Sequence, residues 1–394
     1  MRYVYGFSRW LIWVGVALFV WQVVVPPMQA QAAQAGEVEE LKKRIERLEQ
    51  GPEGSLFEVL KGIQFSGFID TTFNYNFAEP KAPRENRLRV FDRPSNTFSI
   101  NLVEVVLEKK ASDLGTAGFR VDFDAGRDVP FFQAAGFEAG NFDIEQAFVT
   151  YKAPVGDGLT ITFGKFVTLL GAEVIEAPDN FNTSRSFLFG FAIPFTHTGL
   201  LLSYPLSEQV EFTLGVVNGW DNIDDNNDAK SLMGRISFNV AESFSFAVAG
   251  IYGAEQTDRN GPKRWVIDLV STIKPVPGLI LLFNFDYGRE DSVPIGVALI
   301  DTDWSGFALI ASYAFTEQFS LSLRGEFFSD FDGARTGANQ DLWEGTLTAA
   351  YKWVKGFETR LEFRHDQSNV RSFDRDGRPS KSQDTIAGEF IYRF

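Results

Sequence analysis

The chain contains no cysteine, and its only histidines are His197 and His365. Without cysteine there can be no disulfide framework, which argues against a small disulfide-stapled extracellular module. Two histidines and no cysteine also leave no strong transition-metal cluster. We therefore predict no bound metal and no cofactor.

Signatures of catalysis are missing as well. The sequence has no HExxH motif, no Walker phosphate-binding loop and no GxSxG nucleophile motif. No nucleophile motif accompanies His365, so we expect this side chain at the rim of the fold. His197 lies between two threonines and is expected to form local hydrogen bonds or to line a mouth. We predict no catalytic residues and no enzymatic activity.

Positive charge is scarce, whereas aromatic residues are plentiful. The chain has 37 Lys and Arg against 52 Asp and Glu, which gives a formal net charge of −15. Such a chain does not favour nucleic acid as a partner. If the protein encloses a pore and the charge faces the lumen, the field would favour cations. The 40 Phe, 10 Tyr and 8 Trp are many for a soluble exported protein.

Long apolar runs are absent apart from residues 10–20. Arg2 and Arg9 precede this run, and small residues follow it as far as Ala35. A basic, then apolar, then small-residue segment is typical of a secretory signal, so residues 1–35 are predicted to be a signal peptide. An uncleaved anchor is the alternative, although the run is short of the about 20 residues that a spanning helix needs.

Residues 36–61 are predicted to contain a short helix. Apolar side chains occupy the a and d positions of about two heptads, and these side chains are Val38, Leu41, Ile45 and Leu48. Two heptads are marginal for a stable coiled coil. We leave two interpretations open: a periplasmic stalk that self-associates and helps a trimer to form, or a solvated linker helix.

From residue 62 onward the hydrophobic pattern has a period of two. Over residues 357–364 aromatic and leucine side chains alternate with charged ones, and the last strand ends on Phe390, Tyr392 and Phe394. Charge on one face is costly in a dry core but not in a wet lumen. A terminal aromatic residue fits the girdle where a barrel wall leaves the lipid. The pattern predicts an all-β fold, a transmembrane antiparallel up-and-down barrel over residues 62–394.

About sixteen strands are predicted, with fourteen or eighteen as alternatives. They are expected near residues 62–77, 96–110, 117–126, 143–153, 158–167, 197–205, 209–218, 231–240, 243–253, 264–274, 278–288, 303–315, 318–329, 341–353, 356–367 and 384–394. Short turns alternate with long polar links, the latter at 78–95, 127–142, 168–196, 218–230, 289–302, 330–340 and 368–383. This asymmetry is typical of an outer-membrane barrel with long loops outside the cell, and it predicts both termini in the periplasm.

The longest link, residues 168–196, is predicted to fold inward and narrow the pore. A barrel of about sixteen strands would otherwise leave a channel wider than a small solute needs. Its charged side chains are the candidate constriction residues Glu173, Glu176, Asp179 and Arg185. Strand parity gives the candidate pore wall facing them, Arg120, Arg235, Arg264, Arg324, Arg360 and Arg364, with Arg393 as a further member. An external flap with solvated charges is the alternative.

Residues 221–228 are rich in Asp and Asn, whose side-chain oxygens make this segment a candidate calcium site. It lacks the glycine at the sixth position of an EF-hand loop. A solvated acidic loop is the interpretation that we favour, so no metal ligands are assigned.

Several short motifs in the barrel segment are similar to those of a known family. They include Gly67-Phe-Ile-Asp70, Gly118-Phe-Arg-Val-Asp122, Gly164-Lys-Phe166, Gly171-Ala-Glu173, Asn182-Thr-Ser-Arg-Ser186, Pro194-Phe-Thr-His-Thr-Gly199 and Val217-Asn-Gly-Trp-Asp221. In their order and spacing over residues 62–394 they resemble the β-barrel porin-2 family of OmpL-like porins. The resemblance implies an outer-membrane barrel and porin-like diffusion, without a substrate or assigned functional residues. Trimeric sixteen-stranded porins, whose third outer loop narrows the pore, are an analogy for residues 168–196.

Two functions are therefore expected as alternatives. The first is a porin, a passive and weakly cation-selective diffusion channel for small hydrophilic solutes or ions, surrounded by outer-membrane lipids and assembled as a homotrimer. The second is a structural or surface-interaction barrel with a closed lumen. Small polar side chains on the inward face favour the channel, among them Thr160, Thr162, Ser203, Ser322 and Thr346.

Overall fold

A computed structural model describes residues 42–43, 62–81 and 83–394. The predicted signal peptide at 1–35 lies outside the described residues, and so does the predicted helix at 36–61, except for Lys42 and Lys43, which are helical. None of the described helices is both long and apolar enough to cross a membrane.

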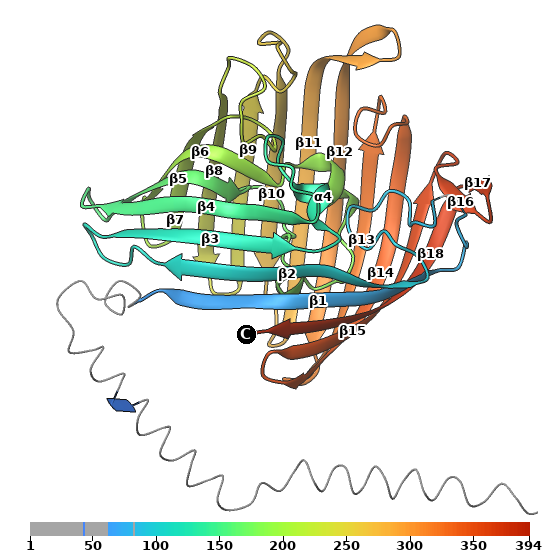
Figure 1. Ribbon diagram of the computed structural model, residues 1–394, viewed down its shortest axis with the longest axis horizontal. Helices are drawn as coiled ribbons and strands as arrows, with labels where there is room; N and C mark the ends of the chain where they lie inside the picture. Colours follow the sequence, from blue (N-terminus) through green and yellow to red (C-terminus); the bar gives the residue numbers. More distant parts are fainter. Residues whose placement is uncertain (1–41, 44–61, 82) are drawn as a thin grey trace, which may run out of the picture. The chain divides into compact units, whose positions relative to one another are not determined.

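Sixteen antiparallel strands close into a barrel (Figure 1). Each strand pairs with its neighbours in sequence, and the last strand pairs with the first. The strands are β1 (Gln64–Asn76), β2 (Thr97–Lys109), β3 (Ala117–Ala125), β4 (Phe142–Ala153), β5 (Leu159–Val167), β6 (Thr196–Pro205), β7 (Val210–Val217), β8 (Ser231–Ala241), β9 (Phe244–Gly253), β10 (Arg264–Ile273), β11 (Leu279–Ile295), β12 (Ala298–Ala314), β13 (Phe319–Asp330), β14 (Gln340–Val354), β15 (Phe357–Ser368) and β18 (Ser382–Arg393). The predicted fold class and strand number are confirmed.

The C-terminal strand closes the barrel. β18 pairs with β1 in a register that sets Phe68 opposite Arg393. The backbone of Phe394 continues this ladder, because its N–H donates to Gly67 O at 3.0 Å and its carbonyl accepts from Gly67 N at 3.2 Å. Its ring stacks on Phe65 with 5.7 Å between centroids. The terminal aromatic residue therefore lies on the outer face, at the seam.

Alternation along each strand separates an outer and an inner face. On β13, Leu323 points outward and is exposed. Arg324 and Glu326, which share the opposite face of the strand, point inward and are buried. Successive side chains of a strand point to opposite faces, so one strand contributes to both environments. The outer wall is apolar and aromatic, as lipid requires, and charged groups line the interior.

One predicted long link is wrong. Residues 289–302 were expected to be a loop, but β11 continues to Ile295 and β12 begins at Ala298. The pairing resumes after an irregularity at Asp291 and Ser292, and both strands extend beyond their neighbours (Figure 1). Charged residues interrupt the apolar alternation where the hairpin leaves the lipid, so the sequence pattern no longer reports a strand there.

Other links contain small elements of their own. The link after β15 contains the hairpin of β16 (Phe373–Arg375) and β17 (Arg378–Ser380). The link after β3 contains the helix α4 (Val129–Phe132), which has Pro130 in its first turn. The link after β5 contains the short helices η1 (Ala177–Asp179) and η2 (Leu188–Ala192). Figure 1 shows α4 within the ring of strands.

Candidate functional site in the barrel lumen

The segment between β5 and β6, residues 168–195, lies inside the barrel. Near its start, Arg235 of β8 donates to Leu169 O at 2.6 Å. Near its end, Trp304 of β12 donates through its indole Nε1 to Ala192 O at 3.1 Å. Both wall side chains point inward, so the segment is held from more than one side of the lumen. We call it the lumenal segment.

Glu173 of the lumenal segment forms a buried ion pair with the wall. Its Oε1 lies 2.7 Å from Nη1 of Arg324 on β13, and Arg324 also binds Glu344 of β14 at 2.7 Å. Burial opposes the ionisation of Glu173, but the charge of Arg324 and a hydrogen bond from Ser186 outweigh it, so its pKa lies below the usual range. Glu173 was predicted from its place in the longest link and Arg324 from strand alternation, and the structure shows that they form an ion pair.

Wall carboxylates bind the backbone of the lumenal segment. Glu326 of β13 accepts hydrogen bonds from the N–H groups of Phe187 and Leu188, both at 2.6 Å. Glu362 of β15 accepts those of Thr183 at 2.7 Å and Ser184 at 3.0 Å. Backbone N–H groups at the start of η2 have no partner within the helix, and a charged acceptor satisfies them strongly.

Sequence reasoning missed the role of Glu326 and Glu362. Their parity along the strand already placed both side chains inward. What they bind depends on the path of the lumenal segment, and that path leaves no signal in a local pattern.

Two predicted wall arginines also hold the lumenal segment. Arg364 donates to the carbonyl of Arg185 at 2.5 Å and binds Asp366 at 2.7 Å. Arg360 donates to the carbonyl of Ala177 at 3.1 Å. Each arginine also has a carboxylate partner on the wall, so these charges are used within the protein.

Arg185 was predicted as a constriction residue, and the structure shows it bound within its own segment. Its guanidinium donates to the carbonyls of Val174 at 2.8 Å, Ile175 at 2.7 Å and Thr183 at 2.9 Å. It also lies over the ring of Phe91, 5.4 Å from the centroid. Arg185 therefore braces the fold of the segment.

The other candidates lie at separate places. Asp179 pairs with Arg393 at 2.6 Å, and both side chains are about half exposed. Asp179 lines a cavity of about 330 Å³, and the polar residues around this cavity include Gln318, Ser320 and Ser322. Arg264 pairs with Glu290 at 2.7 Å and lies over the ring of Trp220, 5.1 Å from its centroid, so these partners lie outside the lumenal segment.

The inner faces of β2, β3 and β4 form an acidic wall. Arg120 pairs with Asp122 at 2.9 Å, and Lys165 pairs with Asp143 at 2.9 Å. Three further carboxylates of this wall have no ion-pair partner among the described residues, and they are Glu104, Asp124 and Glu145. Glu176 of the lumenal segment interacts electrostatically with Arg120 and Asp122, and burial raises its pKa. Of the candidate constriction residues, Glu173 and Glu176 thus face different walls.

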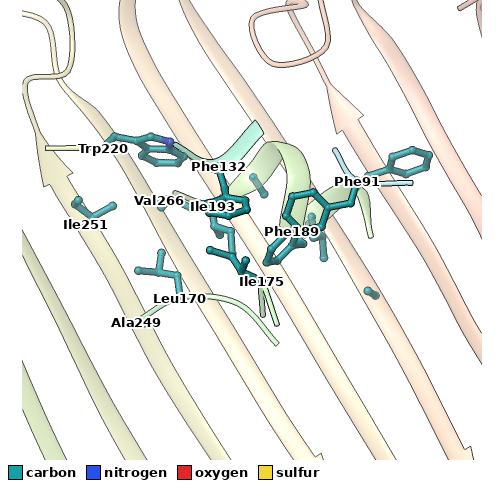
Figure 2. Close-up of a cluster of buried hydrophobic side chains, with 14 of the residues drawn as sticks. Phe91, Phe132, Leu170, Ile175, Phe189, Ile193, Trp220, Ala249, Ile251 and Val266 are labelled. Carbon is teal, nitrogen blue, oxygen red and sulfur yellow. The ribbon is translucent and has the colours of Figure 1, made fainter. Parts of the chain in front are cut away.

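An apolar core fills part of the barrel interior (Figure 2). Strands and links both contribute bulky side chains to it. Phe91 follows β1, Phe132 belongs to α4, and Phe189 belongs to η2, whereas Trp304 and Phe328 come from β12 and β13. Phe91 contacts the rings of Phe132 and Phe189, with centroid distances of 5.9 Å and 5.8 Å. The strand pattern could not show the part of this core that the links supply.

The two histidines are engaged locally. Nδ1 of His197 lies 2.8 Å from Gly219 O, and Nε2 lies 3.2 Å from the hydroxyl of Thr168. His365 is partly exposed and lies 2.7 Å from Asp384. Both arrangements agree with the structural roles expected from the sequence.

The acidic segment 221–228 contributes a structural bond. The carboxylate of Asp221 accepts the N–H groups of Phe195 at 2.6 Å and Thr196 at 2.9 Å, where the lumenal segment joins β6. Within the described part of the chain, the one group of three carboxylates close enough to share a cation is Glu104, Asp124 and Glu145, outside this segment.

Comparisons with known proteins agree with this architecture. A family model described as "Putative beta-barrel porin-2, OmpL-like" matches residues 62–394. A comparison with curated protein sequences finds no significant match.

Solved outer-membrane barrels share the fold. The outer membrane channel DcaP of Acinetobacter baumannii is similar with a TM-score of 0.59 and 13% identity, over 84% of this chain and 97% of that one. An anion-selective porin from Comamonas acidovorans has a TM-score of 0.59 and 10% identity, over 84% and 99%. OmpT of Vibrio cholerae has a TM-score of 0.56 and 12% identity, over 84% and 97%. At these identities the likeness shows a common fold.

Proposed function

The chain belongs to the OmpL-like family of β-barrel porins, and we propose that it is a passive diffusion channel for small hydrophilic solutes. In this proposal the lumenal segment narrows the pore, and the channel is weakly cation-selective. The observation that carries it is the clamping of this segment inside the barrel, through Arg324, Glu326 and Glu362.

The size of the barrel supports a narrowed channel. Sixteen strands leave room for water as well as side chains, and the lumenal segment occupies part of that room. The cavity of about 330 Å³ beside Asp179 has polar walls, and its volume suits a small hydrophilic molecule. Selection by size and by charge at the walls follows from such a geometry.

Charge distribution supports the cation preference. The arginines of β13 and β15 are paired with carboxylates or carbonyls, whereas three carboxylates of the acidic wall have no ion-pair partner among the described side chains. Unpaired negative charge raises the local concentration of cations. A neighbour of the same fold is an anion-selective porin, so selectivity comes from the charges of each chain and not from the fold.

We extend the proposal to the whole precursor. Residues 1–35 act as the export signal, residues 36–61 form a periplasmic helix and residues 62–394 form the porin domain. The long links lie outside the cell, and both termini lie in the periplasm. The protein assembles as a homotrimer, helped by the helix at 36–61. Crosslinking of the purified protein that yields only monomer would contradict the trimer.

The test is single-channel conductance of the purified protein in a planar bilayer, with the reversal potential measured under a salt gradient. Stepwise conductance with a cation-biased reversal potential is expected. Glu176→Gln removes a negative charge that faces the acidic wall and should weaken the bias. Asp376→Asn is the matched control, because this exposed carboxylate pairs with Lys81 at the β16–β17 hairpin and its loss should leave the bias unchanged.

A barrel with a closed lumen is the second candidate, and the apolar core favours it. Phe91, Phe132 and Phe189 pack together inside the ring of strands, where they exclude water. If the purified protein shows no conductance in bilayers although heat-modifiable migration on gels shows that it is folded, the closed barrel is favoured over the open channel.

A further inference from the structure

Three carboxylates on the acidic wall converge on one point. Glu104 lies on β2, Asp124 on β3 and Glu145 on β4. One carboxylate oxygen from each lies within 4.8 Å of those of the other two. The exposed fraction is 4% for Glu104 and 0% for both Asp124 and Glu145. We call these residues the carboxylate trio.

Strand register and a β-bulge build the trio. Glu104 and Asp124 are direct cross-strand partners. Between β3 and β4 the register shifts, so that Asp122 pairs with Gln146, Phe123 pairs with Ile144, and Glu145 is left over. Glu145 and Gln146 are both buried although they are adjacent. A bulge re-aims side chains in this way and is common beside functional sites.

Most oxygens of the trio have no partner outside the trio itself, in which the carboxyl groups of Asp124 and Glu145 lie within hydrogen-bonding reach of each other. Both carboxylate oxygens of Asp124 and both of Glu145 are buried without a hydrogen bond to described residues outside the trio, and so is Oε2 of Glu104. The nearest basic groups are engaged elsewhere, because Arg120 binds Asp122 and Lys165 binds Asp143. Buried carboxylates without partners are costly and call for a positive ligand.

We propose that the carboxylate trio is a binding site for Ca²⁺. Oxygen atoms that lie within 4.8 Å of one another can all contact one cation. Ca²⁺ takes about six to eight oxygen ligands at about 2.3–2.6 Å and accepts several carboxylates, whereas Mg²⁺ keeps several waters and is usually held by about one or two carboxylates. A set made only of carboxylates also suits Ca²⁺ better than Zn²⁺. This site departs from the sequence-based expectation of no metal.

The trio lies where a bound ion would affect the lumenal segment. Glu104, Asp124 and Glu145 all interact electrostatically with Glu176 of that segment. Three carboxylates repel this fourth one. Ca²⁺ removes most of that repulsion and ties three neighbouring strands together, so we expect it to stabilise the barrel and to let Glu176 approach the wall.

The experiment is calorimetric titration of CaCl₂ into the purified folded barrel after treatment with EDTA and dialysis. One ion should bind per chain, at least tenfold more tightly than Mg²⁺. Glu145→Gln should weaken Ca²⁺ binding by tenfold or more. Asp122→Asn is the matched control: its carboxylate lies on the same face of β3, but it is engaged by Arg120 and Gln146, so the variant should bind within about threefold of the unchanged protein.

Folding is checked separately for each variant by heat-modifiable migration on gels. Glu145→Gln removes a repelling charge, so it should fold at least as well as the unchanged chain. The proposal is overturned if the unchanged protein shows no Ca²⁺ binding, because protons would then satisfy the trio. It is also overturned if Glu145→Gln binds normally, or if Asp122→Asn loses binding equally, because a general attraction of the acidic wall would then account for the signal.

Discussion

Two walls of the same barrel differ in how far their charged side chains are paired. On β13–β15, Arg324, Arg360 and Arg364 each bind a carboxylate, and all three also contact the lumenal segment. On β2–β4, acidic groups outnumber basic ones, and the carboxylate trio has no ion-pair partner within the described chain. The first wall uses charge to fix a structure. The second leaves three buried carboxylates without a basic partner among the described residues.

The difference teaches that charged lumen residues cannot be assigned to a pore from strand parity alone. Strand alternation shows that a side chain faces inward. An inward arginine can still form all its hydrogen bonds and ion pairs with a segment packed on it, and it is then not exposed to the pore. Four predictions follow from this contrast between the arginine wall and the acidic wall.

The largest effect is expected on the arginine wall. Arg324→Met leaves Glu173 buried without its ion-pair partner and leaves Glu344 with Arg364 alone, and breaking a buried pair from one side typically costs about 3–5 kcal/mol. The free energy of unfolding, measured by urea titration of the barrel in detergent, should fall by that order. The double variant Arg324→Met with Glu173→Gln should recover part of the loss. If the single variant is as stable as the unchanged protein, the buried network does not hold the lumenal segment.

The second prediction concerns pH, to which loops beside the two walls respond in opposite directions. Burial and the neighbouring Asp92 raise the pKa of Asp128, just after β3, to about 8. The folded state then binds a proton that the unfolded state releases above about pH 4, so stability falls as pH rises from about 4 to 8. Glu173 has a lowered pKa, so its contribution is lost only as the pH falls below the ordinary glutamate range.

The measurement is the free energy of unfolding at pH 5 and pH 8.5. Asp128→Asn removes the group that titrates, and it should lessen the decline over this interval by up to about 4 kcal/mol. The exposed Asp376 provides a control, because Asp376→Asn should leave the slope as it is. An unchanged slope in Asp128→Asn would show that this carboxyl is already ionised at neutral pH.

The third prediction concerns the backbone contacts of the arginine wall. Glu326→Gln replaces charged acceptors of the Phe187 and Leu188 N–H groups with a neutral amide, which should cost about 2 kcal/mol. Proteolysis within residues 168–195 should accelerate while the barrel itself remains folded. Glu358→Gln is the control, because Glu358 is partly exposed and its ion pair is with Arg360 of the same strand rather than with the lumenal segment. Equal proteolysis of both variants would mean that Glu326 does not anchor the segment.

The sequence pattern predicted the strands of the barrel wall, but it did not predict the lumenal segment's contacts or the apolar core inside the barrel. Sixteen strands could be placed because every wall residue faces either lipid or lumen, and this choice repeats every two residues. The pattern failed for the ends of β11 and β12, where partly exposed charged residues such as Arg289 and Asp291 interrupt the apolar alternation. It also failed for the apolar core, since Phe91 and Phe189 lie in links without periodicity.

The candidate site was predictable to the same degree. Arg324 and Glu173 were found separately, by parity and by their place in the longest link, but their pairing depends on the path of 168–195. The carboxylate trio could not be found from the sequence, because the bulge at Glu145 changes the inward parity midway along β4.

The smallest effect is expected from the arginine of the acidic wall. The side chain of Arg120 is 27% exposed, whereas that of Arg324 is 0% exposed. Arg120→Met leaves Asp122 still bound by the amide of Gln146 at 2.6 Å, so the unfolding free energy should fall by less than about 1 kcal/mol. The same change makes the acidic wall more negative, and the cation bias of the reversal potential should increase. A loss as large as that of Arg324→Met, measured in the same urea titration, would mean that the acidic wall is also held by its ion pairs, and the contrast between the two walls would not stand.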